Sequence, residues 1–147
     1  MLISTKGRYA IRVMIDLAEN RQSGYVPLRD VAERQQISEK YLESIISLLS
    51  KAGLVEGIRG KGGGYRLTRE PEEYTAWEIL NVANGTMAPV ACLKDGAPEC
   101  DRQDICKSLS LYENIYELME LYLGEITLPQ LVSGEFTTAE EFAGKKL

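Results

Sequence analysis

Histidine is absent from the 147-residue chain. Its absence excludes the catalytic dyads and triads that depend on imidazole, and every zinc site with a histidine ligand. The chain also lacks an uninterrupted apolar run near the roughly 18 residues that a membrane span requires. Residues 1–8 contain no apolar stretch of signal-peptide length. We therefore expect a soluble, cytoplasmic protein.

Charge is divided unequally along the chain, which has 22 Asp and Glu, 17 Lys and Arg, and a net charge of −5. Residues 1–70 hold 12 basic and 8 acidic side chains, whereas residues 71–147 hold 5 and 14. The first half therefore carries a net charge of +4 and the second half one of −9. Only the first half is suited to neutralising nucleic-acid phosphates.

The basic half contains signals for three helices and a hairpin. Apolar residues recur at helical spacing in the first helix, which Ser4 or Thr5 can cap. Pro27 suits the start of a second helix, because its missing N–H costs nothing there, and Ser38 suits the N-cap of a third. The predicted elements are helices over Thr5–Glu19, Leu28–Glu33 and the segment from Ser38 to Lys51, then strands over Leu54–Arg59 and Tyr65–Thr68.

This order of elements predicts a mainly α fold with a small β-hairpin wing, the winged helix-turn-helix. The helix after Ser38 follows a tight polar turn, as a recognition helix does when its first residues enter the major groove. Arg59 and Lys61 flank a glycine-rich tip that can approach phosphates, and Arg59 can enter a minor groove. The candidate DNA-contacting residues are Ser38, Glu39, Lys40, Tyr41, Glu43, Ser44, Arg59 and Lys61.

The glycine run at 60–64 has a second interpretation, a phosphate-binding loop. It lacks the last glycine of a dinucleotide fingerprint and the Gly-Lys-Ser/Thr ending of a P-loop. It also leads into a predicted strand, whereas both of those motifs open a helix. A three-helix unit with a polar outer face also occurs in proteins that never touch DNA, but the net charge of +4 favours the winged helix.

The acidic half begins after Pro71 with a helix for which Thr75 and Glu78 can form a capping box. A long helix from about Lys107 to Leu123 follows, and Thr127 caps a last short turn. The predicted organisation is a DNA-binding domain over 1–70, a cysteine loop and dimerisation helix over 71–132, and a flexible tail over 133–147.

The long helix carries more apolar surface than one core stripe needs. We expect Leu109, Tyr112 and Tyr116 to be buried within their own domain. A two-fold dimer contact explains the remaining apolar face. The candidate dimerisation residues are Leu111, Ile115, Leu118 and Tyr122.

Three cysteines, Cys92, Cys100 and Cys106, lie within fifteen residues of a polar loop. An odd number of cysteines in a reducing compartment does not indicate a disulfide framework. Cysteine is most often a small buried hydrophobe, but a loop rich in turn residues can fold around a metal. Thiolates suit iron–sulfur clusters, zinc or copper(I). A plain thiol sensor without metal is a further alternative.

Several ordered motifs resemble the IscR, NsrR and CymR group of bacterial winged-helix regulators. They are Ser4-Thr5-Lys6-Gly7-Arg8-Tyr9-Ala10, Ile37-Ser38-Glu39-Lys40-Tyr41-Leu42-Glu43 and the stretch from Ala52 to Tyr65, and the resemblance extends to about residue 132. It implies a transcriptional regulator, and not an enzyme, that binds pseudo-palindromic operators as a homodimer joined through the long C-terminal helix. It also implies an iron–sulfur cluster, [2Fe-2S] or [4Fe-4S], on the three cysteines.

The fourth cluster ligand of these relatives does not carry over. The IscR type has a histidine where this chain has Leu109, and the NsrR type has an acidic residue where this chain has Arg8. Asp95, Glu99, Asp101, Asp104, Ser108, a small molecule or an open position remain candidates. The CymR type implies a different regulator, which lacks a cluster and binds an enzyme of cysteine metabolism. The resemblance therefore predicts a redox- or iron-sensing regulator, with thiol oxidation or a partner enzyme as the alternative.

Overall fold

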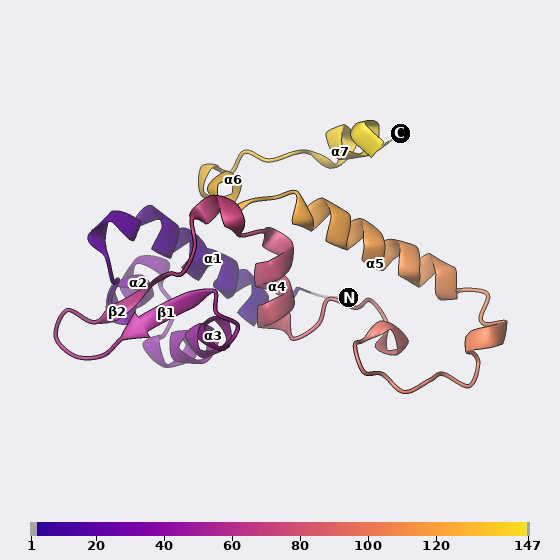
Figure 1. Ribbon diagram of the computed structural model, residues 1–147, viewed down its shortest axis with the longest axis horizontal. Coiled ribbons are helices and arrows are strands. Elements are labelled where there is room, and N and C mark those ends of the chain that lie inside the picture. The colour runs from indigo at the N-terminus through magenta and orange to yellow at the C-terminus, as the bar shows by residue number, and fades with distance from the viewer. Residues whose placement is uncertain (1–2, 147) are drawn as a thin grey trace.

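The computed structural model describes residues 3–146, which form a winged-helix domain and a long helix that projects from it (Figure 1). Helices α1 (Thr5–Glu19), α2 (Leu28–Gln35) and α3 (Glu39–Lys51) precede the hairpin of β1 (Val55–Ile58) and β2 (Gly64–Leu67). Their order confirms the predicted mainly α fold with a β-hairpin wing. The second predicted helix is two residues longer than expected, β1 is two residues shorter, and β2 keeps its predicted length but begins and ends one residue earlier.

The acidic half adds α4 (Ala76–Asn84), α5 (Leu109–Gly124) and α6 (Leu128–Ser133). Helix α4 packs on α1 and α3 and also contacts α5, while α6 returns to α1. The loop between α4 and α5 extends to the far end of α5, away from the wing (Figure 1). Where the sequence predicted a flexible tail, the structure places α7 (Ala139–Lys146), whose Phe142 packs edge-on against Tyr122 at 5.3 Å between ring centres.

The core forms where the apolar faces of α1, α3 and α4 meet. Four apolar residues of α3 and four of α1 are buried, whereas Ile11, Ile15 and Ala18 of α1 are half-buried. These core residues are Ala10, Val13, Met14, Leu17, Leu42, Ile45, Ile46, Leu49 and Ile79. Burial of this continuous apolar surface fixes the angle of α3 relative to the rest of the domain.

Side-chain caps set the helix starts that the sequence predicted. The Ser4 hydroxyl accepts a hydrogen bond from Gly7 N at 3.0 Å, and Thr75 accepts one from Glu78 N at 3.2 Å. Such caps satisfy backbone N–H groups that the first helical turn leaves unpaired. The Glu78 side chain, predicted to complete a capping box, instead forms an ion pair with Arg69 at 2.7 Å.

Candidate functional site

The N-terminal turn of α3 presents polar side chains to solvent. Ser38 caps the helix by accepting a hydrogen bond from Tyr41 N at 3.2 Å. Glu39, Lys40 and Glu43 are exposed on the following turns. A rigid helix with an exposed polar start has the shape of an element that inserts into a major groove.

The two other residues predicted on this surface are tied more closely to the fold. The Tyr41 ring is half-buried and packs edge-on against Tyr9 of α1, with 5.7 Å between ring centres. The Ser44 hydroxyl donates a hydrogen bond of 2.7 Å to the Tyr41 carbonyl. The structure therefore brings all six predicted α3 residues into the first two turns of one helix, with Tyr41 and Ser44 partly covered.

The wing tip carries Arg59 and Lys61 as exposed cations. Within residues 3–146, neither forms an ion pair, and Lys40 forms none either. By contrast, Arg66 on β2 is held at 2.7 Å from the Glu56 carboxylate. Cations without a carboxylate partner are free to neutralise phosphates, so the tip and the start of α3 both carry charge that is available for nucleic acid.

A buried carboxylate fixes the angle between α1 and α2, and no sequence pattern indicates it. Asp16 is 1% exposed and accepts hydrogen bonds from Arg34 Nε at 3.0 Å and from Arg34 Nη2 at 2.8 Å. Gln35 donates a third hydrogen bond to the same carboxylate at 3.0 Å. A buried charge is tolerated when it is paired and hydrogen-bonded in this way.

The tight turn between α2 and α3 depends on Gln36, which adopts a left-handed conformation with φ 53°. Within residues 3–146 it is the one non-glycine residue with a positive φ. Glycine or asparagine is the usual signal for such a position. The sequence predicted a tight polar turn here but could not assign the conformation to this residue.

The three cysteines line one small cavity of about 140 Å³ at the far end of α5. Cys92 and Cys100 are exposed and Cys106 is half-buried, so none of them is the buried hydrophobe that cysteine most often is. Leu109 and Glu113 of α5 line the same cavity, together with Glu99 and Gln103 of the loop. The structure thus places the predicted cysteine site where the loop meets the long helix.

Hydrogen bonds around Cys106 favour the thiolate form of its side chain. A hydrogen bond with the Ser108 side chain, at 3.5 Å between Sγ and Oγ, lowers the pKa of Cys106, and backbone hydrogen bonds from Ser108 and Leu109 and the charge of Arg102 act in the same direction. The thiolate is the form that binds metals and reacts with oxidants. Among residues 3–146, no three Cys, Asp or Glu side chains stand close enough together to hold a metal ion.

Helix α5 has no fully buried residue in the monomer. Leu109, Tyr112 and Tyr116, predicted to be buried in their own domain, are only half-buried, because α5 meets the domain mainly through α4, where Tyr116 packs against Trp77. Leu111 and Leu118 are 56% and 57% exposed. Such an apolar helix in contact with water indicates an interface.

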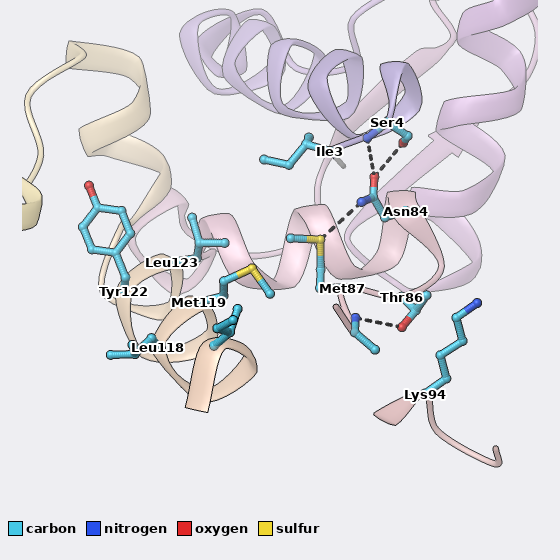
Figure 2. A pocket seen from close by; sticks show the side chains of 12 residues that line it. Ile3, Ser4, Asn84, Thr86, Met87, Lys94, Leu118, Met119, Tyr122 and Leu123 are labelled. Carbon is cyan, nitrogen blue, oxygen red and sulfur yellow. Dashed lines mark hydrogen bonds between the residues drawn. The ribbon is translucent and has the colours of Figure 1, made fainter. Parts of the chain in front are cut away.

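A larger apolar cavity of about 700 Å³ runs along α5, the end of α4 and the start of α1. Ile115, Leu118 and Tyr122, three of the four predicted dimerisation residues, line it. Figure 2 shows Met119 and Leu123 of α5 on one side of this cavity, and Met87 after α4 on another. Three of the four predicted dimerisation residues therefore border one largely apolar cavity, and Leu111 lies outside its lining.

A family model described as "Iron-dependent Transcriptional regulator", Rrf2, matches residues 3–134. The chain belongs to the Rrf2 family. The HTH-type transcriptional regulator IscR of Klebsiella pneumoniae (strain 342) is 37% identical over 135 residues, which span 92% of this chain and 82% of the relative. The resemblance seen in the sequence is thereby confirmed.

Solved structures of Rrf2-type regulators have the same fold. CymR (YrzC), the global cysteine regulator of B. subtilis, is 38% identical with a TM-score of 0.72 and covers 92% of this chain and 99% of its own. T. potens IscR is 34% identical with a TM-score of 0.71, and the match covers 97% of this chain and 96% of the IscR chain. This Rrf2 protein is therefore a transcriptional regulator rather than an enzyme. No helix within residues 3–146 is long and apolar enough to span a membrane.

Proposed function

We propose that this Rrf2 protein is a homodimeric DNA-binding regulator that senses iron–sulfur cluster, redox or iron status. Cys92, Cys100 and Cys106 hold the cluster in this proposal. The observation that carries it is the cavity of about 140 Å³ that all three cysteines line. The first and last of them, Cys92 and Cys106, are 14 positions apart along an irregular loop. Iron–sulfur clusters are held by cysteine thiolates, so the donors fit the group in kind.

The DNA-reading part of the proposal uses the start of α3 and the wing. Glu39 and Glu43 can accept hydrogen bonds from cytosine amino groups, and Lys40 can reach guanine or a phosphate. Ser38, Tyr41 and Ser44 complete the surface, with Tyr41 and Ser44 as its supporting side chains. Arg59 and Lys61 contact the backbone or a neighbouring minor groove.

Two copies of this surface are needed to read an operator. One recognition helix contacts too few base pairs for useful specificity, and two-fold dimers bind half-sites about 34–36 Å apart. The apolar face of α5, with the exposed Leu111 and Leu118 and the half-buried Ile115 and Tyr122, supplies the isologous contact. The expected operator is therefore a double-stranded, pseudo-palindromic sequence.

The cysteines lie where a change in the loop reaches the dimer helix. The Cys106 carbonyl accepts a hydrogen bond from Leu109 N at 3.5 Å, so this cysteine leads directly into the first turn of α5. Cys92 follows α4, which packs on the recognition helix. A bound cluster supplies redox-sensitive iron–thiolate bonds. Drawing the three thiols together would shift α5 relative to α4, and with it the spacing of the two recognition helices.

Anaerobic reconstitution with iron and sulfide tests the proposal. Visible thiolate-to-iron absorbance is expected, and Cys92→Ala, Cys100→Ala and Cys106→Ala are each expected to remove most of it. Operator affinity or sequence preference is expected to differ between the cluster-loaded and cluster-free dimer. Absorbance that survives all three substitutions, or identical DNA binding in both forms, would contradict the proposal.

Cluster-free control by thiol oxidation is the second candidate, and the lowered pKa of Cys106 favours it. A partner enzyme of cysteine metabolism, as for the CymR type, belongs to the same cluster-free class. These functions are expected to give no visible absorbance after reconstitution. An oxidised form would instead carry fewer titratable thiols and bind the operator differently.

A further inference from the structure

We propose that Glu113 of α5 is the fourth protein ligand of the cluster, an inference that rests on the proposed function. Glu113 lies on the long helix, outside the cysteine loop. Its side chain nevertheless lines the same cavity as Cys92, Cys100 and Cys106. The assignment makes the dimer helix itself part of the cluster site.

A fourth ligand from this chain would have to be a donor other than cysteine or histidine. Clusters of both common types take four protein ligands, and this chain has three cysteines and no histidine. Carboxylate oxygens are known ligands of iron in proteins. The question is therefore which carboxylate the fold places beside the three thiols.

The cavity narrows the choice to two carboxylates. Among the described residues that line it, Glu99 and Glu113 are the acidic ones. Asp95, Asp101 and Asp104 belong to the same loop but do not line it. Glu99 is adjacent to Cys100 in the chain and lies on the same loop.

Helix geometry favours Glu113 over Glu99. Leu109 and Glu113 are four residues apart on one face of α5, separated by about 6 Å along the helix axis. Leu109 is apolar, so the first donor on this face is the Glu113 carboxylate. A ligand on a rigid helix holds its position better than a ligand on a loop. Since Leu109 N is hydrogen-bonded to the Cys106 carbonyl, the position of Cys106 is fixed relative to the same helix.

The Glu113 carboxylate is free to bind. It is exposed and forms no ion pair or hydrogen bond with other residues in the 3–146 range. Binding would therefore break no existing interaction. A carboxylate is a harder and more readily displaced ligand than a thiolate, so a cluster held in this way would release iron more easily than one held by four cysteines.

Two substitutions and a matched control test the assignment on the full-length, anaerobically reconstituted dimer. Glu113→Gln is expected to keep cluster absorbance, because the three thiols remain, but to change the visible circular dichroism and at least double the rate of cluster loss in air. Glu113→Cys is expected to slow that loss at least threefold by providing a fourth thiolate. Glu117→Cys, one turn further along α5 and not part of the cavity lining, is expected to behave as the wild type.

Other outcomes would overturn the inference. One is that both Glu113 variants show the visible circular dichroism and the rate of cluster loss of the wild type. Another is that Glu99→Gln, and not Glu113→Gln, changes the circular dichroism and speeds the loss of the cluster. Equal stabilisation by Glu113→Cys and Glu117→Cys would also overturn it, because a new thiol anywhere on α5 would then suffice. Failure of the wild type to form any cluster would overturn the proposed function itself. Far-ultraviolet circular dichroism and the dimer mass verify that each variant is folded.

Discussion

The hydroxyl of Tyr74 donates a hydrogen bond of 2.7 Å to the backbone carbonyl of Leu54, twenty residues earlier in the chain. The same oxygen accepts hydrogen bonds from the N–H groups of Thr68, at 2.9 Å, and Arg69, at 3.0 Å. Tyr74 is fully buried. One side chain therefore ties both ends of the wing hairpin to the segment that starts α4.

Tyr74→Phe is expected to lower the free energy of unfolding by about 1–3 kcal/mol, because two N–H groups lose their acceptor in a buried site. Urea denaturation of the two proteins measures the difference. Tyr112→Phe is the matched control, since the Tyr112 hydroxyl has no hydrogen bond within residues 3–146, and a change of less than about 0.5 kcal/mol is expected there. Equal stability of Tyr74→Phe and the wild type would contradict this account of the Tyr74 hydrogen bonds.

Local sequence signals predicted the helices of the winged domain well. Ser38 and Thr75 cap the helices that they were expected to cap. A hydroxyl directly before an apolar periodic segment is a typical N-cap, because its oxygen can accept a hydrogen bond from an N–H group of the first turn. The contact of Tyr74 with Leu54 could not be predicted in this way. It depends on how the hairpin folds back on the chain, and a single tyrosine carries no signal for such a distant partner.

The cysteine site could be predicted only in part. Spacing and polarity identified Cys92, Cys100 and Cys106 as a group, and the structure places them on one cavity. Glu113 carries no such signal, because its neighbours in the sequence indicate only a helix surface. Its role follows from the return of the loop onto the first turns of α5, a tertiary feature without a periodic pattern.

Gly7 is required by close packing against the end of α4. A Cβ atom at Gly7 would lie 2.5 Å from Asn84 Oδ1, which accepts hydrogen bonds from Ser4 N and Ser4 Oγ. Gly7→Ala is expected to destabilise the protein by about 1–3 kcal/mol through overpacking. In an Asn84→Ala background the clash disappears, and the same change is expected to be neutral or stabilising by about 0.5–1 kcal/mol. Additive effects in this double-mutant cycle would refute the contact.

Gly64 allows the wing to approach the chain before α2. A Cβ atom there would lie 2.3 Å from the backbone carbon and oxygen of Val26, which pairs with Tyr65 through two hydrogen bonds of 2.8 Å. Gly64→Ala is expected to destabilise the protein by about 3 kcal/mol and to weaken DNA binding by displacing the wing. Gly124→Ala, in open space at the end of α5, is expected to stabilise it by about 0.4–1 kcal/mol. Thermal unfolding measures both changes in stability: a lower melting temperature is expected for Gly64→Ala and a higher one for Gly124→Ala.

We expect Ser108 to raise the reactivity of the Cys106 thiol in the cluster-free protein. Its hydroxyl hydrogen bond holds the pKa of Cys106 below the usual thiol value, because the bond favours the thiolate. Ser108→Ala is therefore expected to raise that pKa, so that less thiolate is present at pH 8 and alkylation by iodoacetamide is slower. The midpoint of the rate against pH is expected to move upward for Cys106 and to stay fixed in Ser110→Ala. A downward or absent shift would contradict the assignment.

Lys40 and Lys51 provide a matched pair for the DNA-binding face, since both are exposed cations on α3, at opposite ends about 16 Å apart. If the start of α3 meets the duplex, Lys40→Ala removes one phosphate contact per protomer. The slope of log K against log salt concentration is then expected to become less negative by about 1.8 for the dimer, at roughly 0.9 per phosphate. Lys51→Ala removes the same charge from the distant end and is expected to leave the slope unchanged. Fluorescence anisotropy with an operator duplex at several salt concentrations measures both slopes, and equal changes would mean that net charge, rather than the orientation of α3, governs binding.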